Sequence, residues 1–202
     1  MKKLTTLALL LCVSSFTVLA HSDHDHYGEG QDVTVKTTKV SGNVYMLQGR
    51  GGNIGAIVGP QGILIIDDDY KVVSEKLREA LKELGSATPK FIINTHWHGD
   101  HTEGNEIFGK DSIIISHDNV RKRLMQTNTI FGQAVPPSAA IGWPMLTYAD
   151  SITIHFDGED IRAEHYPNGH TDGDSVIFFP KANVVHMGDD FFAGRFPFVD
   201  RE

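Results

Sequence analysis

The first part of the chain alternates short apolar segments with turns rich in glycine. The apolar segments are dominated by Val and Ile, which is typical of β-strands in a meander. A longer segment follows, in which Leu77, Ala80, Leu81 and Leu84 recur at helical spacing before Gly85. This pattern predicts strands over residues 33–40, 44–47, 54–58 and 63–66, and then a helix over residues 71–84.

The second part of the chain mixes helices with strands and returns to strands at its end. Residues 127–149 contain several prolines and are predicted to be an irregular segment at the rim of a pocket. Strands first, then strand–helix alternation, then strands again predict an α+β fold in which two sheets pack face to face with helices outside. The predicted elements are strands over residues 91–94, 112–116, 152–156, 161–165, 175–179 and 183–187, and helices over residues 104–108 and 118–126.

The N-terminal residues have the pattern of a secretory signal. Lys2 and Lys3 precede an apolar stretch, and small residues before Ala20 suit a cleavage site, so residues 1–20 are predicted to be a signal peptide. The apolar stretch is too short for a comfortable membrane span, so we expect no stable membrane anchoring. We expect an exported protein, periplasmic or secreted, with a His-rich disordered leader over residues 21–30 and one domain over residues 31–202.

Composition narrows the chemistry that the domain can perform. The chain carries 26 acidic against 18 basic residues, and two of the lysines lie in the signal, so a nucleic-acid partner is excluded for want of a basic face. The single cysteine, Cys12, also lies in the signal. The domain therefore has no disulfide and no catalytic thiol, and its chemistry must depend on histidine, carboxylates and other oxygen groups.

A histidine cluster directly after the strand at residues 91–94 is the strongest chemical signal. Along an extended backbone alternate side chains share a side, so His96 and His98 can hold one ion together. Gly99 permits a tight turn, from which Asp100 and His101 can reach a second ion. Imidazole and carboxylate ligands without thiolate suit a zinc-like divalent cation.

Two later segments extend this cluster to a candidate site for two metal ions. His170 lies in a turn flanked by glycines, and Asp189 follows an apolar strand. A lone histidine in a turn is more often solvated, and an aspartate after a strand is often a helix cap. In this order after the first cluster, however, the two segments form a strong combined signal.

The set of motifs resembles the metallo-β-lactamase superfamily, from the Asn53 turn to Asp189. The resemblance implies a four-layer αββα sandwich with the metals at one sheet edge. It also implies that Asp67 supports the loop that carries His96 and His98 (the metal loop) without binding the metal itself. An ordinary carboxylate at a strand end stays open as an alternative. The implied zinc ligands are His96, His98 and His170 on the first ion, Asp100 and His101 on the second, and Asp189 bridging both.

One feature departs from the family pattern. Members usually supply a further histidine to the second metal some tens of residues after the Asp189 position, and no histidine follows Asp189 here. The last strand–helix unit of the sandwich is also missing. We therefore expect a C-terminally truncated domain that binds up to two zinc ions, with the second site weak or empty. His165 could approach from outside, but a half-buried strand histidine is the preferred interpretation.

The resemblance implies a zinc-dependent hydrolase that acts on a small-molecule substrate. A metal-bound hydroxide would attack an ester, lactone, thioester or β-lactam-type carbonyl, and Asp100 is the candidate catalytic residue that orients the water. The alternative is a non-catalytic, metal-buffering exported protein, which the His-rich leader and the missing ligand favour. A serine hydrolase is disfavoured because the chain has no Gly-x-Ser-x-Gly turn.

Overall fold

The computed structural model describes residues 33–194, 196–197 and 199, and these contain two main β-sheets. The predicted signal peptide and the His-rich leader lie outside the described residues. The larger sheet has seven strands in the order β1-β2-β3-β4-β5-β6-β9, antiparallel from β1 to β4 and parallel from β4 to β9. Its strands are β1 (Lys36–Ser41), β2 (Val44–Gln48), β3 (Asn53–Gly59), β4 (Gly62–Ile66), β5 (Phe91–Ile93), β6 (Ile113–His117) and β9 (Leu146–Tyr148).

The smaller sheet is an antiparallel meander of four consecutive strands. These are β10 (Ser151–Phe156), β11 (Glu159–His165), β12 (Ser175–Phe179) and β13 (Val184–His186). A short hairpin, β7 (Asn128–Ile130) and β8 (Gln133–Val135), stands apart from both sheets in the pairing pattern. The helices are η1 (Lys71–Val73), α1 (Ser74–Glu83), α2 (Gly99–Thr102), α3 (Asn105–Phe108), α4 (Asp118–Leu124), η2 (Ala140–Gly142) and η3 (Gly188–Asp190).

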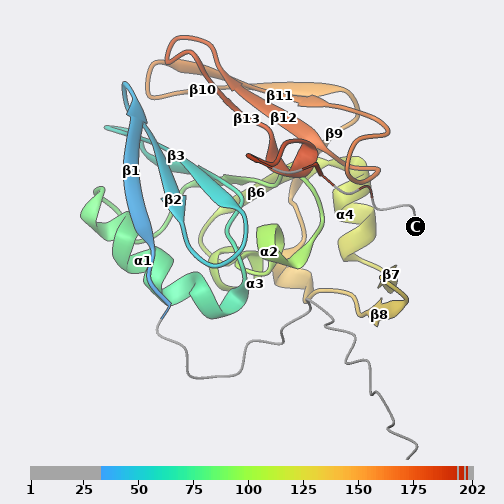
Figure 1. Cartoon of the computed structure of the whole chain (residues 1–202). Helices are drawn as coiled ribbons and strands as arrows, with labels where there is room; N and C mark the ends of the chain where they lie inside the picture. The colour runs from blue at the N-terminus through green and yellow to red at the C-terminus, as the bar shows by residue number, and fades with distance from the viewer. Residues whose placement is uncertain (1–32, 195, 198, 200–202) are drawn as a thin grey trace, which may run out of the picture. The chain divides into compact units, whose positions relative to one another are not determined.

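Alternation along the central strands divides the core into two layers. In β4, Leu64 and Ile66 face the smaller sheet, where they join a cluster that includes Ile161 and Ile177. The intervening side chains of β4 pack instead with the apolar side of α1 and with Phe108 of α3. Figure 1 shows the same arrangement, with the smaller sheet on one side of the larger one and α1 and α3 on the other. The predicted α+β sandwich of face-to-face sheets is therefore confirmed.

The outer side of the smaller sheet carries exposed side chains. Thr153, Arg162 and Val185 lie on this side in neighbouring strands, and all three are exposed. Within the described residues, no helix covers this row. None of the described helices is long and apolar enough to cross a lipid bilayer.

Two sequence predictions of local structure were wrong. The segment over residues 127–149 is not irregular throughout, because it contains β7, β8 and β9. Strand β9 is only three residues long and is held by parallel pairing with β6, which its own sequence does not reveal. The turn after His98 is the short helix α2, which begins at Gly99.

Two stacked histidines join the sheets near the end of β6. The rings of His117 and His165 are nearly parallel, with centroids 3.6 Å apart. His117 Nδ1 accepts a hydrogen bond from Asn119 N at the start of α4, and its Nε2 donates to Ala149 O. Both ring nitrogens of His117 are therefore used in its neutral form. Burial, and then the neighbouring His165, lower the pKa of His117 below its ordinary value.

This shift predicts a loss of stability in mild acid. In the unfolded chain His117 regains a pKa of about 6.5, so the unfolded state binds the proton first as the pH falls. His117→Asn keeps a helix-capping side chain and removes the titrating group. With a chelator present, urea unfolding between about pH 7.5 and 5.5 should show a smaller loss of free energy for His117→Asn than for the wild type. Equal losses in the two proteins would contradict the prediction.

Candidate metal centre

The candidate site lies at the carboxyl ends of the parallel strands, where the two sheets meet. Asp67 directly follows β4, and the loop that contains His96 and His98 follows β5. The loop that contains His170 joins β11 to β12, and Asp189 lies in η3 after β13. Because carboxyl ends of neighbouring parallel strands share one edge, residues far apart in sequence are brought together there. A hydrogen bond from Ser175 N to Thr95 O, 2.9 Å long, joins the two sheets at this edge.

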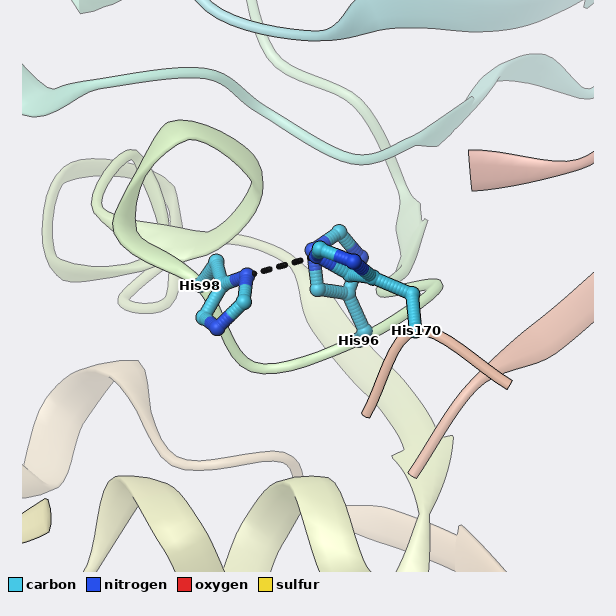
Figure 2. Close-up of side chains that lie close together, drawn as sticks. All are labelled: His96, His98 and His170. Carbon is cyan, nitrogen blue, oxygen red and sulfur yellow. Dashed lines mark hydrogen bonds between the residues drawn. The ribbon is translucent and has the colours of Figure 1, made fainter. Parts of the chain in front are cut away.

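The first group of candidate ligands consists of three buried imidazoles. His96, His98 and His170 each offer a ring nitrogen, and these atoms all lie within 4.8 Å of one another. His170 Nε2 and His98 Nδ1 are 2.9 Å apart. Figure 2 shows the three rings converging from two loops, one carrying His96 and His98 and the other His170. The structure thus brings together the three residues predicted for the first ion.

The second group of candidate ligands shares one residue with the first. It consists of His96, His101 and Asp189, again with ligand atoms within 4.8 Å of one another. His101 Nε2 lies 3.1 Å from Asp189 Oδ1, and His170 Nε2 lies 3.7 Å from Asp189 Oδ2. The Asp189 carboxylate therefore belongs to the second group and also approaches His170 of the first; its role as a bridge between two ions stays a prediction.

Asp67 supports this arrangement through hydrogen bonds to the metal loop. Its Oδ1 accepts a hydrogen bond from Thr95 N (2.7 Å) and its Oδ2 accepts one from Thr95 Oγ1 (2.8 Å). His101 Nδ1 is 2.7 Å from the same Oδ2. Asp67 also has a left-handed backbone, with φ at 62°, which few residues other than glycine adopt. Of the two interpretations of Asp67, the supporting carboxylate agrees with these contacts.

These contacts determine which nitrogen of each ring carries hydrogen. The carboxylate of Asp67 accepts only, so His101 Nδ1 is the donor, and in the neutral ring Nε2 keeps a lone pair. The Thr95 hydroxyl directs its hydrogen to Asp67, so it accepts from His96 Nδ1, 3.0 Å away. The Nε2 atom of His96 is buried and has no hydrogen-bond partner among the described residues, whereas His101 Nε2 lies beside the Asp189 carboxylate. A buried nitrogen with a free lone pair is suited to hold a cation.

The pKa values of the neighbouring rings of His96 and His101 are shifted in opposite directions. Burial, and then the charges of His101, His98 and His170, hold the pKa of His96 well below its ordinary value. Burial also disfavours a charge on His101, but the carboxylates of Asp67, Asp100 and Asp189 outweigh it and raise its pKa well above the usual value. The carboxylates therefore favour a positive charge at this position, which is either a proton on His101 or a bound cation in place of that proton.

Asp100, predicted to be both a ligand and the catalytic residue, lies beside the site. Its Oδ2 is 3.5 Å from His101 Nε2, and 29% of its side chain is exposed. Asp100 belongs to neither group of converging ligand atoms. Burial raises its pKa, but the hydrogen bond and charge of His101, the charge of His98 and a backbone hydrogen bond together lower it by more, so the carboxyl is ionised over a wider pH range than usual. An ionised, partly exposed carboxylate is suited to orient water or substrate.

The site also contains a supporting residue that the sequence did not identify. Asp69 follows Asp67 with a second left-handed φ of 62° and accepts hydrogen bonds from the backbone of Arg50, Gly51 and Tyr70. These bonds hold the glycine-rich turn over residues 49–52 against the metal loop. A Cβ atom at Gly52 would lie 2.3 Å from His101 Cε1, so only glycine fits there. Three consecutive aspartates at a strand end were the available signal, but nothing in the sequence linked them to this turn.

Three of the other histidines within residues 33–194 do not join the candidate site. His165 is partly buried and stacks on His117, which agrees with its interpretation as a half-buried strand residue. His155 is largely exposed and pairs with Asp160 on the outer side of the smaller sheet. His186 directs Nε2 to Asn53 O, 2.9 Å away.

Comparison with known proteins now places the chain in a family. Residues 37–202 match the model of the metallo-beta-lactamase superfamily, and the chain belongs to that superfamily. An atrochrysone carboxyl ACP thioesterase from Aspergillus terreus is 25% identical over 89% of this chain and 52% of its own length. A hydroxyacylglutathione hydrolase from a Synechococcus species is 27% identical over 75% of this chain and 49% of its own length. The chain thus spans about half the length of these curated relatives.

Solved structures show the same fold. A metallo-beta-lactamase of Cronobacter sakazakii has a TM-score of 0.67 at 18% identity, covering 81% of this chain and 66% of its own. A subclass B3 metallo-beta-lactamase isolated from a soil metagenome library has a TM-score of 0.63 at 20% identity, covering 81% of this chain and 67% of its own.

Replacing the supporting carboxylate by an amide should weaken metal binding. In Asp67→Asn one carboxylate oxygen becomes an NH2 donor, so the side chain can no longer accept from all three of Thr95 N, Thr95 Oγ1 and His101 Nδ1. We expect zinc affinity, measured by calorimetry, to fall about 10- to 100-fold, as is typical when the partner of a ligand is lost. Asp111→Asn, at an exposed position away from the site, is the matched control and should bind like the wild type. Unchanged affinity in Asp67→Asn would show that its contacts do not hold the ligand rings.

Proposed function

We propose that this chain is a zinc-dependent hydrolase that acts outside the cytoplasm on a small molecule with a reactive carbonyl. The proposal depends mainly on one observation, the convergence of His96, His98 and His170 on one point with a buried, unpartnered nitrogen on His96. Membership of the metallo-beta-lactamase superfamily supports it. The proposal of export rests on the signal-like pattern of residues 1–20.

The donor set fits a zinc ion. Neutral imidazoles and a carboxylate, without thiolate, suit zinc better than calcium or magnesium, which prefer oxygen ligands. His96, His98 and His170 would hold the first ion, and His101 and Asp189 would contribute to a second. When bound, zinc would act as a Lewis acid and bring the pKa of a water to about 7.

The residues of the chain supply orientation and charge. Asp67 fixes Nδ1 of His96 and of His101 as hydrogen donors, which leaves Nε2 of each neutral ring to bind a cation. Asp100 is ionised and partly exposed beside His101, where it can accept a hydrogen bond from the attacking water or take up its proton. Burial of the histidine cluster limits competing solvent, which strengthens electrostatic interactions at the reacting carbonyl.

The substrate is proposed as a class, namely an ester, thioester, lactone or β-lactam. The names of the two relatives, a thioesterase and a hydroxyacylglutathione hydrolase, favour acyl-bond cleavage. The structural neighbours extend the class to lactams. A metal-buffering protein without catalysis is the alternative, because the same histidines would bind zinc in either case.

Removing one of the converging imidazoles should abolish turnover. The zinc-loaded protein is assayed with a chromogenic β-lactam, an aryl ester, a lactone and a thioester. Turnover of at least one substrate is expected, and His98→Ala should reduce its kcat/KM by at least about 100-fold, since it removes a direct ligand. His155→Ala, an exposed histidine outside the site, is the control and should keep full activity. Stoichiometric zinc binding by a wild-type protein that cleaves none of the substrates would favour the buffering role.

The role of Asp100 is tested separately. Asp100→Asn removes the charge and the proton acceptor but keeps the size of the side chain. We expect kcat to fall about 100-fold, within the usual contribution of a positioned acid or base, while zinc binding by the three converging imidazoles is retained. Zinc content measured by mass spectrometry on the same sample separates a catalytic loss from a metal loss. Unchanged kcat would exclude Asp100 from catalysis.

A further inference from the structure

The first ligand group is divided between two loops that belong to different sheets. His98 lies after β5 of the larger sheet, whereas His170 lies between β11 and β12 of the smaller one, 72 residues further along. Their ring nitrogens are nevertheless 2.9 Å apart. Loops are the most mobile parts of a fold, so some other element must fix the distance between them.

Helix α4 contacts the loop that carries His170 in three ways. Arg123 forms a forked ion pair with Asp172, with Nε 3.2 and 3.1 Å from the two carboxylate oxygens and a terminal nitrogen 3.0 Å from Oδ2. Asn119 Nδ2 donates to Asp172 O at 2.7 Å. Gly173 lies so close to the helix that an added Cβ would be 2.9 Å from Val120 Cγ2.

The same helix contacts the loop that carries His98. Trp97, only 4% exposed, packs in a buried cluster with Val120 and Leu124 of α4. The Arg123 guanidinium lies 5.9 Å from the centre of the Trp97 ring, within the range of a cation–π interaction. The Trp97 ring in turn lies 4.6 Å from the His98 ring. Arg123 therefore contacts both loops at once, each next to a candidate ligand.

We propose that Arg123 is a positioning residue that sets the spacing of His98 and His170 for a divalent cation. It acts on His170 through Asp172 and on His98 through Trp97. The inference rests on the proposed function only in that the site binds a cation, and it does not depend on turnover. A partly exposed ion pair contributes little to global stability, so an ordinary surface role predicts almost no effect on the metal site. The positioning role predicts a large effect on the metal site with a small effect on unfolding.

The chain contains a closely matched control. Arg162 on β11 also pairs with a carboxylate, Glu164, at 2.8 Å, and lies over an aromatic ring, Phe178, with 5.0 Å to the centroid. It lies on the exposed outer side of the smaller sheet. Arg123→Met and Arg162→Met therefore remove the same kinds of contact at two places, only one of which adjoins the ligands.

The test measures zinc affinity by calorimetry for the wild type and the variants. We expect Arg123→Met to lose about 10- to 100-fold in affinity at the three-imidazole group, and Arg162→Met to match the wild type. Arg123→Lys should be intermediate, because it keeps a charge over Trp97 but loses the forked bond. The double variant Arg123→Met/Asp172→Asn should bind zinc no more weakly than the weaker of the two single variants, because both changes break the same ion pair.

Hydrogen exchange of the metal-free proteins gives a second readout that needs no metal. Exchange in residues 95–101 and 169–174 should be faster in Arg123→Met than in the wild type, whereas the strands and Arg162→Met should be unchanged. The proposal would be overturned if Arg123→Met had the zinc affinity and the exchange rates of the wild type. It would also be overturned if Arg162→Met lost as much zinc affinity as Arg123→Met. If Arg123→Met does not fold, Arg123→Lys and Asp172→Asn decide by the same criteria. A wild type that binds zinc without turnover would sink the proposed hydrolase and leave this inference standing.

Discussion

The candidate site depends first on one buried carboxylate, that of Asp67. It joins the end of β4 to the loop after β5 by accepting from Thr95 N, Thr95 Oγ1 and His101 Nδ1. A buried charge is costly unless hydrogen bonds compensate it, and these three contacts do so. Through the Thr95 hydroxyl, the same carboxylate also determines the hydrogen position on His96. One group thereby orients two rings, one of which is shared by both candidate metal groups.

Around this carboxylate, each ligand loop has its own support. Asp69 holds the glycine-rich turn against His101, and the helix α4 holds the His98 and His170 loops together. Strands β5, β11 and β12 end or begin next to these loops, so each loop is held by a sheet at one or both of its ends. A binding site on loops requires such support, because an error of about 1 Å in ligand position lowers both affinity and reactivity.

The sequence predicted the face-to-face sheets from local signals, and the converging histidines from the order of their motifs and the resemblance to a family. Apolar runs that end in polar residues mark strand ends; His96 and His98 follow such an end, and His170 lies in a glycine-flanked turn before the next strand. Contacts between distant segments produce no such signal. The pair formed by Arg123 and Asp172 spans 49 residues and has no pattern in either segment. Strand β9 was missed for the same reason, since it exists through its pairing with β6.

The separation of His98 and His170 along the chain has a consequence for assembly. Bringing them together closes a large loop, and the entropy of that closure must be overcome by packing of the two sheets before any ion can be chelated. An unfolded or half-assembled chain keeps the local pair His96 and His98 but lacks the third imidazole, so it binds the ion less tightly. By mass action, a cation held between the sheets therefore favours the assembled domain. Where the protein acts, the concentration of free metal would then influence how long each molecule survives proteolysis.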